Sequence, residues 1–318
     1  MEFVTKKTTE LSLAEKQGIV TLFNEVFERE RTVEEFDLEF LNTIEGYSYH
    51  TIGIDNGIIV AANTMVPAKY HIGGKLVNAV NSVDTMIAKD HRGLENFYDM
   101  AKASFKYSED NGYEVVVGFP NDNSYELFTK LKFMKDVGRL DTFCLPYRIG
   151  GIKKGLEFLN PLSMLFCRIW AGCSSLFASS KPASFCMHKD DVSYNKTRYQ
   201  RTKGPYGYTE VSGTTCVYRI MDHEGVRTAF VADIYQKSPK SFCKAATYLI
   251  KNEGKSFDLL LYVGHLPFTN TGLIKIPRKY EPKRFNFTAT FFDKRLVDKK
   301  EFYNINNWDV NLSNYDLL

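Results

Sequence analysis

Residues 81–133 constrain the fold of this chain more than any other stretch. Asn81 to Ile87 alternates in polarity and is rich in β-branched residues, which predicts a strand. From Phe97 onward apolar and small residues follow helical spacing, and Asn111–Gly112 suits a left-handed helix end. Tyr113 to Phe119 is then an apolar run, typical of a buried strand. The stretch therefore reads strand, turn, helix, strand, and the fold class we predict is α/β with a mixed sheet.

The turn before this helix has the composition of an anion-binding loop. It reads Lys89-Asp90-His91-Arg92-Gly93. Backbone N–H groups at a helix start lack intrahelical partners, and the helix dipole favours negative charge there. Arg92 and His91 add positive charge and hydrogen-bond donors. A pyrophosphate would fit such a site.

The order of these motifs resembles the cofactor half of a GNAT-type N-acyltransferase, the fold that moves acyl groups from coenzyme A. The family's phosphate loop reads Arg/Gln-x-x-Gly-x-Gly/Ala, and here the segment is Arg92-Gly93-Leu94-Glu95-Asn96-Phe97. The first Arg and the adjacent Gly match. Glu95 replaces the second glycine and Phe97 replaces the last small residue. Glu95 either repels the ligand or points outward and leaves the N–H groups free, since glutamate suits the first turn of a helix.

A second part of the signature follows in Asn121-x-x-Ser124-x-x-x-Phe128 and Lys130-Leu131-Lys132-Phe133. In the family the eighth position is often a tyrosine that protonates the departing thiolate. Phe128 cannot donate a proton. Tyr125 lies about one helical turn earlier and is our candidate for that acid.

The resemblance implies acetyl-CoA as co-substrate, a small amine as acceptor and no metal. Backbone N–H groups around Met86–Ile87 would donate to the thioester oxygen. Asp84 is the first candidate for the base, and the alternative is a satisfied strand carboxylate. The residues expected to bind the cofactor are Met86, Ile87, His91, Arg92, Gly93, Leu94, Glu95, Asn96, Phe97, Asn121, Ser124 and Phe128.

Local patterns divide the chain into three parts. Residues 1–150 form the expected acyl-CoA-binding domain, with a capping box at Ser12-x-x-Glu15, strands near 48–55, 58–67, 76–87 and 137–147, and a hairpin turn at Asn56–Gly57. Residues 151–190 are a linker with a helix. Residues 191–318 repeat the hairpin–helix–strand order, with a helix capped at Ser238–Pro239 and no phosphate loop.

The last part therefore reads as a second, degenerate GNAT-like lobe. Two such lobes are similar to tandem GNAT proteins, including aminoacyl transferases of the peptidoglycan type. The closing Asn307-Trp308-Asp309-Val310-Asn311 resembles tails of bacterial polysaccharide-cluster acyltransferases, and Asp309 would complete the acceptor pocket. Arg198-Tyr-Gln-Arg201 is a small basic patch, usually solvated but able to meet a phosphorylated acceptor.

The linker contains an unusually apolar stretch. Phe158 to Ser180 carries one charge, Arg168, and is interrupted by Asn160–Pro161 and Gly172, which suits a membrane-spanning helix poorly. Two alternatives stay open for residues 156–178. One is a linker helix packed on the core, and the other is an amphipathic helix that touches a membrane surface beside Lys153–Lys154.

Composition sets the broad class. The chain has 318 residues and a net charge of +3, too small to indicate a nucleic-acid partner. Six cysteines without a Cys-x-x-Cys pair, and an N-terminus without an apolar leader, predict a cytoplasmic protein with reduced thiols. Oligomeric state is left open.

We expect a bacterial-type N-acetyltransferase that acts on an amine, such as an amino sugar for surface polysaccharide. The alternatives are an aminoacyl transferase of the peptidoglycan type and a non-catalytic ligand-binding member of the fold.

Overall fold

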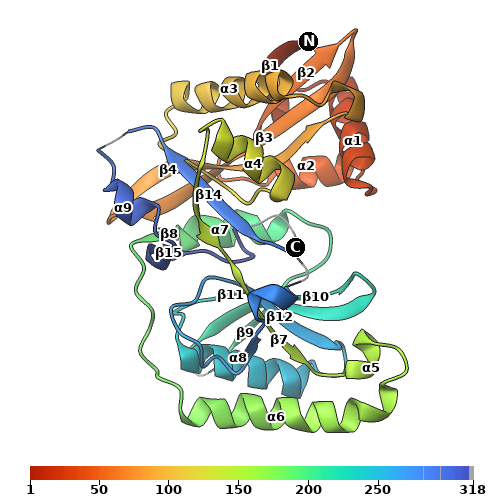
Figure 1. The fold of residues 1–318 in the computed structure, drawn as a ribbon, viewed down its shortest axis with the longest axis vertical. Coiled ribbons are helices and arrows are strands. Elements are labelled where there is room, and N and C mark those ends of the chain that lie inside the picture. Colours follow the sequence, from red (N-terminus) through yellow and green to blue (C-terminus); the bar gives the residue numbers. More distant parts are fainter. Residues whose placement is uncertain (212, 282, 294, 315–318) are drawn as a thin grey trace. The chain divides into compact units, whose positions relative to one another are not determined.

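The chain forms two compact units, each with its own mixed sheet (Figure 1). This computed structural model describes residues 1–211, 213–281, 283–293 and 295–314. Unit 1 contains Met1–Arg139, Cys186–Lys203 and Arg284–Asn307, and unit 2 contains Leu140–Phe185, Gly204–Lys283 and the segment from Trp308 onward. The predicted α/β class with mixed sheets is confirmed. The three-part division of the chain stays a prediction.

The sheet of unit 1 follows the order β1-β2-β3-β4-β5-β14-β6, and β8 pairs with the far end of β3. Only β4 and β5 run parallel among the neighbours on this path. The strands are β1 (Glu2–Lys7), β2 (Tyr49–Asp55), β3 (Ile58–Ile72), β4 (Lys75–Ile87), β5 (Val115–Gly118), β6 (Lys135–Arg139), β8 (Met187–Lys189) and β14 (Asn286–Phe291).

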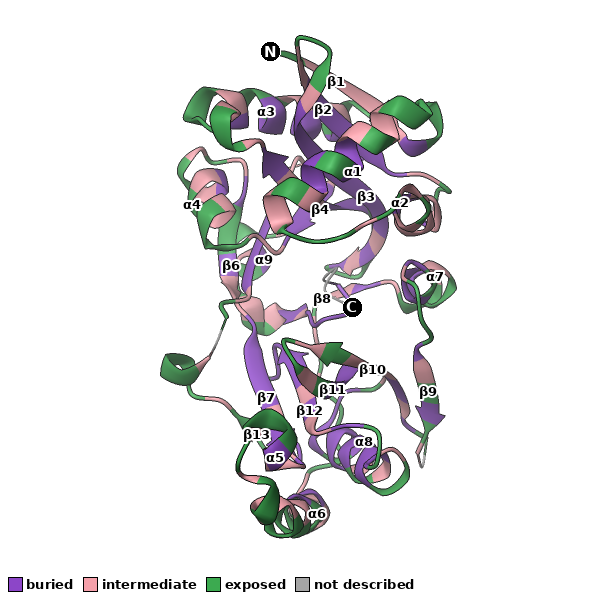
Figure 2. Cartoon of the chain, turned by 90° about the vertical axis from the view of Figure 1, so that its right-hand side faces the viewer, coloured by how far each residue is buried: buried purple, intermediate pink, exposed green. Residues whose placement is uncertain are grey.

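Helices cover both faces of this sheet. On one face α1 (Leu13–Phe27) and α2 (Val33–Leu41) bury Phe23 and Phe36 in a cluster with Met86. On the other face α3 (Leu94–Asp110) and α4 (Asp122–Lys130) bury Phe105 and Phe128 in a second cluster. Figure 2 shows the buried residues along the strands between these helices. The short helices of unit 1 are α7 (Asp191–Thr197) and α9 (Lys299–Phe302).

Unit 2 has the strand order β13-β7-β12-β11-β10-β9. Helix α8 (Pro239–Asn252) buries Phe242 and Leu249 in the core, and α6 (Asn160–Leu176) packs against α8 (Figure 1). The remaining elements are α5 (Ile149–Ile152), β7 (Asp141–Pro146), β9 (Gly207–Glu210), β10 (Thr215–His223), β11 (Val226–Ile234), β12 (Leu259–Gly264), β13 (Ile274–Lys275) and β15 (Trp308–Asp309).

One predicted strand is wrong. The sequence indicated a single strand near 137–147, but the chain passes from unit 1 to unit 2 at Leu140. β6 ends at Arg139 and joins β14, whereas β7 begins at Asp141 and pairs with β12 in the other sheet. The remaining predicted hairpins and helices are confirmed, including the capping boxes that start α1 and α8.

Among the described residues no helix has both the length and the hydropathy to cross a bilayer.

Candidate active site

The two parallel strands of unit 1 separate partway along their length. Pairing between β4 and β5 begins at Ala79↔Val115 and ends at Ser82↔Gly118, where β5 stops, while β4 continues to Ile87. Ala88 donates its N–H to the carbonyl oxygen of Val60 on β3, at 2.8 Å. Because donors alternate along a strand, the N–H of Ile87 points away from β3, to the side that β5 has left. Of the two predicted thioester donors, Ile87 therefore faces this split and Met86 faces β3.

The split leads to the start of α3, which no side chain caps. Phe97 makes the first helical bond, donating its N–H to the Gly93 carbonyl at 3.1 Å, so the N–H groups of Leu94, Glu95 and Asn96 stand at the open helix end. A Cβ placed on Gly93 would meet no atom within 4 Å. The backbone is thus open to an anion at this position.

Side chains hold the loop in place and leave its outer surface exposed. Arg92 donates from Nε to the Ile87 carbonyl at 3.2 Å, which fixes the guanidinium at the end of β4. Asn96 donates to the His91 carbonyl at 2.8 Å, and His91 Nε2 lies 3.2 Å from Asp55. Arg92 and Glu95 are both exposed. His91 and Asn96 therefore hold the loop, while Arg92 and the helix start are accessible.

The corresponding helix of unit 2 lacks this opening. α8 follows β11 and leads to the parallel strand β12, as α3 links β4 and β5. Its start is closed because Ser238 accepts the N–H of Ser241 at 3.0 Å and Pro239 occupies the first turn. Of these two helix starts, the one in unit 1 is therefore open.

Asp84 lies in a β-bulge of β4. Asp84 and Thr85 together stand opposite the single residue Asn63 of β3, and Asp84 has φ +47°. Its carboxylate accepts a hydrogen bond from Arg31, which also pairs with Glu39 at 3.0 Å. Both partners are largely buried, so Asp84 is an ion-paired carboxylate in a left-handed backbone conformation.

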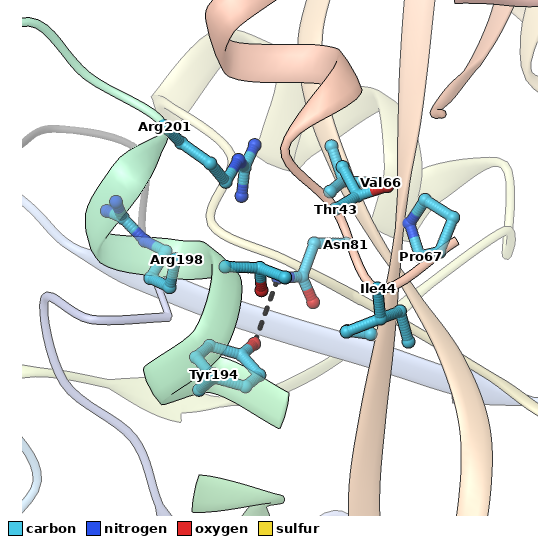
Figure 3. Close-up of a pocket in the computed structure, with 10 residues that line it drawn as sticks. Thr43, Ile44, Val66, Pro67, Asn81, Tyr194, Arg198 and Arg201 are labelled. Atoms are coloured by element: carbon cyan, nitrogen blue, oxygen red, sulfur yellow. Dashed lines mark hydrogen bonds between the residues drawn. The ribbon is translucent and has the colours of Figure 1, made fainter. Parts of the chain in front are cut away.

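Glu39 extends this charge chain to a small pocket. Arg201 donates from Nε to the Glu39 carbonyl at 2.9 Å, and its guanidinium lies 4.0 Å from the Glu39 carboxylate. The cavity beside it has a volume of about 20 Å³ and is lined by Thr43, Ile44, Val66, Pro67, Ala68, Asn81, Tyr194, Thr197, Arg198 and Arg201. Figure 3 shows Tyr194 bonded to Asn81 across this pocket. The Arg198–Arg201 patch is therefore buried, and the expectation of a solvated patch is wrong.

Two predicted cofactor contacts are core residues. Phe97 and Phe128 are each nearly fully buried, and their rings meet edge to face at 4.9 Å. These two of the departures from the family pattern thus form one packing contact. Asn121 and Ser124 form the N-terminal cap of α4, because the Asn121 side chain accepts the Ser124 N–H at 3.0 Å.

Tyr125, the candidate acid, lies on α4. Burial, with the Asp136 carboxylate adding to it, raises the pKa of its phenol. The group is therefore protonated at neutral pH, as a proton donor must be.

A polar cluster beside the bulge was missed in the sequence. Asn63 Oδ1 accepts hydrogen bonds from Thr85 at 2.7 Å and Ser82 at 3.2 Å. The Asn63 Nδ2 is buried and has no hydrogen-bond partner among the described residues. Unsatisfied buried donors are uncommon, so this amide is a candidate ligand contact. The signal was the run of polar residues in a strand that is otherwise buried.

Asp309, the predicted acceptor residue, belongs to unit 2, whereas the other predicted site residues belong to unit 1. It pairs with Lys237 at 2.9 Å, and Lys237 also pairs with the buried Asp233. Its neighbour Asn311 bridges to Gly264 of β12 and donates to Asp233 of β11 at 2.7 Å. This segment thus packs where β11 and β12 separate, and the acceptor role of Asp309 stays a prediction.

The sequence from residue 7 to residue 132 matches the family of acetyltransferase (GNAT) domains. By this match, residues 7–132 resemble a GNAT acetyltransferase domain. The matched region contains the β4–β5 split, the Arg92–Gly93 loop and Asp84. The family resemblance seen in the sequence is thereby confirmed, and the tandem-lobe likeness stays a prediction.

Solved structures share the fold at low sequence identity. A probable N-acyltransferase from Enterococcus faecalis V583, described as a conserved protein of unknown function, has 10% identity and a TM-score of 0.57, covering 92% of this chain and 72% of its own. A GCN5-related N-acetyltransferase from Kribbella flavida has 11% identity and a TM-score of 0.56 with the same coverage. Saccharomyces cerevisiae N-myristoyltransferase, solved with myristoyl-CoA, has 9% identity and a TM-score of 0.56, covering 93% and 80%. No curated protein matches the sequence.

Proposed function

We propose that the protein transfers an acetyl group from acetyl-CoA to the amine of a small acceptor. The observation that carries this proposal is the β4–β5 split that leads from the Ile87 N–H to the open start of α3. The helix start and Arg92 would hold the pyrophosphate, and the Ile87 N–H would face the thioester oxygen. Cytoplasmic location and a bacterial-type enzyme are part of the same proposal.

The chemistry is a direct transfer. The amine nitrogen forms a bond to the thioester carbonyl carbon, and the carbon–sulfur bond breaks to release the CoA thiolate. Asp84 would take the proton that the amine loses, and Tyr125 would give one to the thiolate. For Asp84 to accept this proton, its ion pair with Arg31 must weaken or break. Arg31 would keep its ion pair with Glu39 when that happens.

The charge chain supports an acceptor with an anionic group. It runs from Asp84 through Arg31 and Glu39 to Arg201, which lines the pocket together with Arg198. Two arginines at one pocket suit a phosphate, because a guanidinium group can donate two parallel hydrogen bonds to phosphate oxygens. The cavity of about 20 Å³ holds about one water, so the acceptor that we propose, a phosphorylated or nucleotide-linked amino sugar used for surface polysaccharide, requires Arg198 and Arg201 to open toward it.

A second candidate function is ligand binding without turnover. It is supported by Phe128, which occupies the core where the family often has a proton-donating tyrosine. Under this alternative acetyl-CoA binds, but no free thiol appears with any amine. An aminoacyl transferase of the tandem type is the other alternative. It is supported by the strand–helix–strand crossover to a parallel strand that both units contain.

Calorimetry with acetyl-CoA tests the proposal. We expect saturable binding by the wild type and at least about tenfold weaker binding by Arg92→Ala, because a charge-assisted contact to phosphate is lost. Arg295→Ala is the matched control, since Arg295 is an exposed arginine of unit 1 paired with Asp293. Absence of binding at millimolar acetyl-CoA would sink the proposal. Thiol release in the presence of amino sugars then separates turnover from binding alone.

A further inference from the structure

Helix α6 of unit 2 buries small side chains and exposes large apolar ones, which is the reverse of an ordinary surface helix. Small residues point inward: Cys167 and Ala171 are fully buried, and Ser163 donates to the carbonyl oxygens of Pro146 and Tyr147 at 2.7 Å. Large apolar residues lie outside, with exposures between 43% and 77%. They are Leu162, Leu165, Phe166, Ile169, Trp170 and Leu176.

These outer residues form one continuous stripe. Spacings of three, four and seven residues place them on the same side of the helix. Phe166 and Trp170 stack with ring centroids 6.0 Å apart, and Phe158 and Phe177 extend the exposed apolar surface at both ends. Figure 2, which views α6 end-on, shows exposed residues (green) on this helix. Apolar side chains gathered in this way mark an interaction surface, unlike single exposed ones.

The charges beside the stripe are almost all positive. Lys153 and Lys154 precede α6 and Lys181 follows it, all exposed, and Arg168 lies at its middle. Glu157 is the single acidic residue from 153 to 189. A groove of about 200 Å³ between α6 and α8, lined by Arg168, Ala171, Thr247, Ile250 and Lys251, adds a second cation at the helix. It offers a place for a headgroup phosphate.

We propose that α6 lies in the plane of a membrane surface that carries anionic lipids. The apolar stripe enters the boundary between headgroups and acyl chains, and the flanking lysines and Arg168 contact the headgroups. A second copy of the chain fits less well, because Lys153 and Lys154 precede the stripe and Lys181 follows it, so either orientation of two copies would bring like charges together. The proposal is independent of acetyl transfer, and its tests need no acetyl-CoA.

Vesicle co-sedimentation tests the apolar stripe. We expect binding to vesicles of phosphatidylcholine with phosphatidylglycerol, and at least about tenfold weaker partitioning for the double variant Phe166→Ser/Trp170→Ser. The matched control is Ile58→Ser/Val192→Ser, which removes two apolar residues of unit 1 that are more exposed than Phe166 and Trp170. Absence of wild-type binding, or an equal loss in the control, overturns the proposal.

Charge reversal tests the lipid preference. Lys153→Glu/Lys154→Glu should lower binding to the anionic vesicles by at least about tenfold and leave weak binding to pure phosphatidylcholine unchanged. Equal binding of wild type and variant to both vesicle types would remove the anionic part of the proposal.

Tryptophan fluorescence locates the contact. Trp170 is on the stripe and Trp308 is fully buried, so brominated lipids should quench Trp170 alone. Trp170→Phe should bind vesicles as the wild type does but lose the quenching. Sedimentation equilibrium tests whether a second copy of the chain covers α6 instead. A wild-type protein that forms a dimer and does not bind vesicles, together with a monomeric Phe166→Ser/Trp170→Ser variant, would show that it does.

Discussion

At the scale of single residues, Asp84 carries the sharpest question about catalysis. Its left-handed backbone is uncommon for a non-glycine residue, and its ion pair with Arg31 stabilises that conformation. Strained residues of this kind concentrate at functional sites, yet the ion pair alone would also explain the carboxylate. A substitution that keeps the backbone conformation separates a catalytic carboxylate from a purely structural one.

Asp84→Asn is that substitution, because asparagine also tolerates the left-handed conformation. We expect turnover to fall by about 10²- to 10⁴-fold with acetyl-CoA affinity unchanged, as for the loss of a general base. The free energy of unfolding should fall by about 1–3 kcal/mol, since the largely buried Arg31 loses a charged partner. Steady-state kinetics, calorimetry and urea unfolding measure the three quantities. Full activity would rule out Asp84 as the base.

Glu95 sits in the first turn of α3, where the pyrophosphate would bind, and its side chain is exposed. We expect Glu95→Gly to tighten acetyl-CoA binding about two- to fivefold, because a negative charge leaves an anion site. Glu95→Gln separates charge from size, since it keeps the length of the side chain. Unchanged affinity in both variants would mean that the carboxylate points outward.

His50 predicts a pH dependence of stability. It is fully buried between Thr8 and Thr64, at 2.9 and 3.0 Å, and burial lowers the pKa of its imidazole to about 3. In the unfolded chain the pKa is near 6.5, so below that pH the unfolded state binds a proton that the folded state does not.

The free energy of unfolding should therefore be highest above pH 6.5. It should fall by about 1.4 kcal/mol per pH unit between about pH 6 and pH 3 from this residue alone. His50→Asn should flatten this dependence, as measured by urea unfolding at several pH values. His223→Asn, a change at a partly exposed histidine, is the control. An unchanged slope in His50→Asn would contradict the assignment.

At the scale of elements, local sequence patterns predicted the helix starts and turns that neighbouring residues determine. Helices α1 and α8 begin at the capping residues that the sequence marks, and the Asn56–Gly57 turn joins β2 and β3. The β4–α3–β5 order and its Arg92–Gly93 loop were likewise visible. What the pattern could not show is the contact of Arg31 with Asp84, made across 53 positions of sequence, or the bulge that this ion pair supports.

The pairing of strands within the sheets was also not predicted from the sequence. The sequence contained a strand at Asn286–Phe291, with alternating polarity, but gave no sign that it pairs with β5 and β6. The break at Leu140 was hidden for the same reason, since both β6 and β7 suit a strand and only their partners differ.

The Phe97–Phe128 contact predicts the effect of restoring the family's tyrosine. In Phe128→Tyr a hydroxyl would enter the predominantly apolar cluster that contains Phe97 and Phe105. We expect the free energy of unfolding to fall by about 1–3 kcal/mol and turnover not to rise. Tyr125→Phe is the counterpart and should lower turnover with little change in stability. A large gain in turnover for Phe128→Tyr would show that the family position works here as an acid.

At the scale of the whole molecule, the two units exchange segments of sequence. β7 leaves the first stretch of the chain to join the sheet of unit 2, and β14 comes from the last part of the chain to lie between β5 and β6 of unit 1. The 186–203 segment also belongs to unit 1 and supplies Arg201, the partner of Glu39. Unit 1 is therefore encoded mostly, but not wholly, before residue 140.

This exchange predicts how fragments behave. A chain of residues 1–150 lacks β14, so β5, whose Val115, Val116 and Val117 are fully buried in the intact protein, would become an exposed apolar edge. We expect this fragment to aggregate when expressed alone. Co-expressed with residues 151–318, which carry β14 and the 186–203 segment, it should co-purify as a soluble pair with the acetyl-CoA affinity of the intact chain. A cooperative unfolding transition for residues 1–150 alone would show that the strand exchange is dispensable for unit 1.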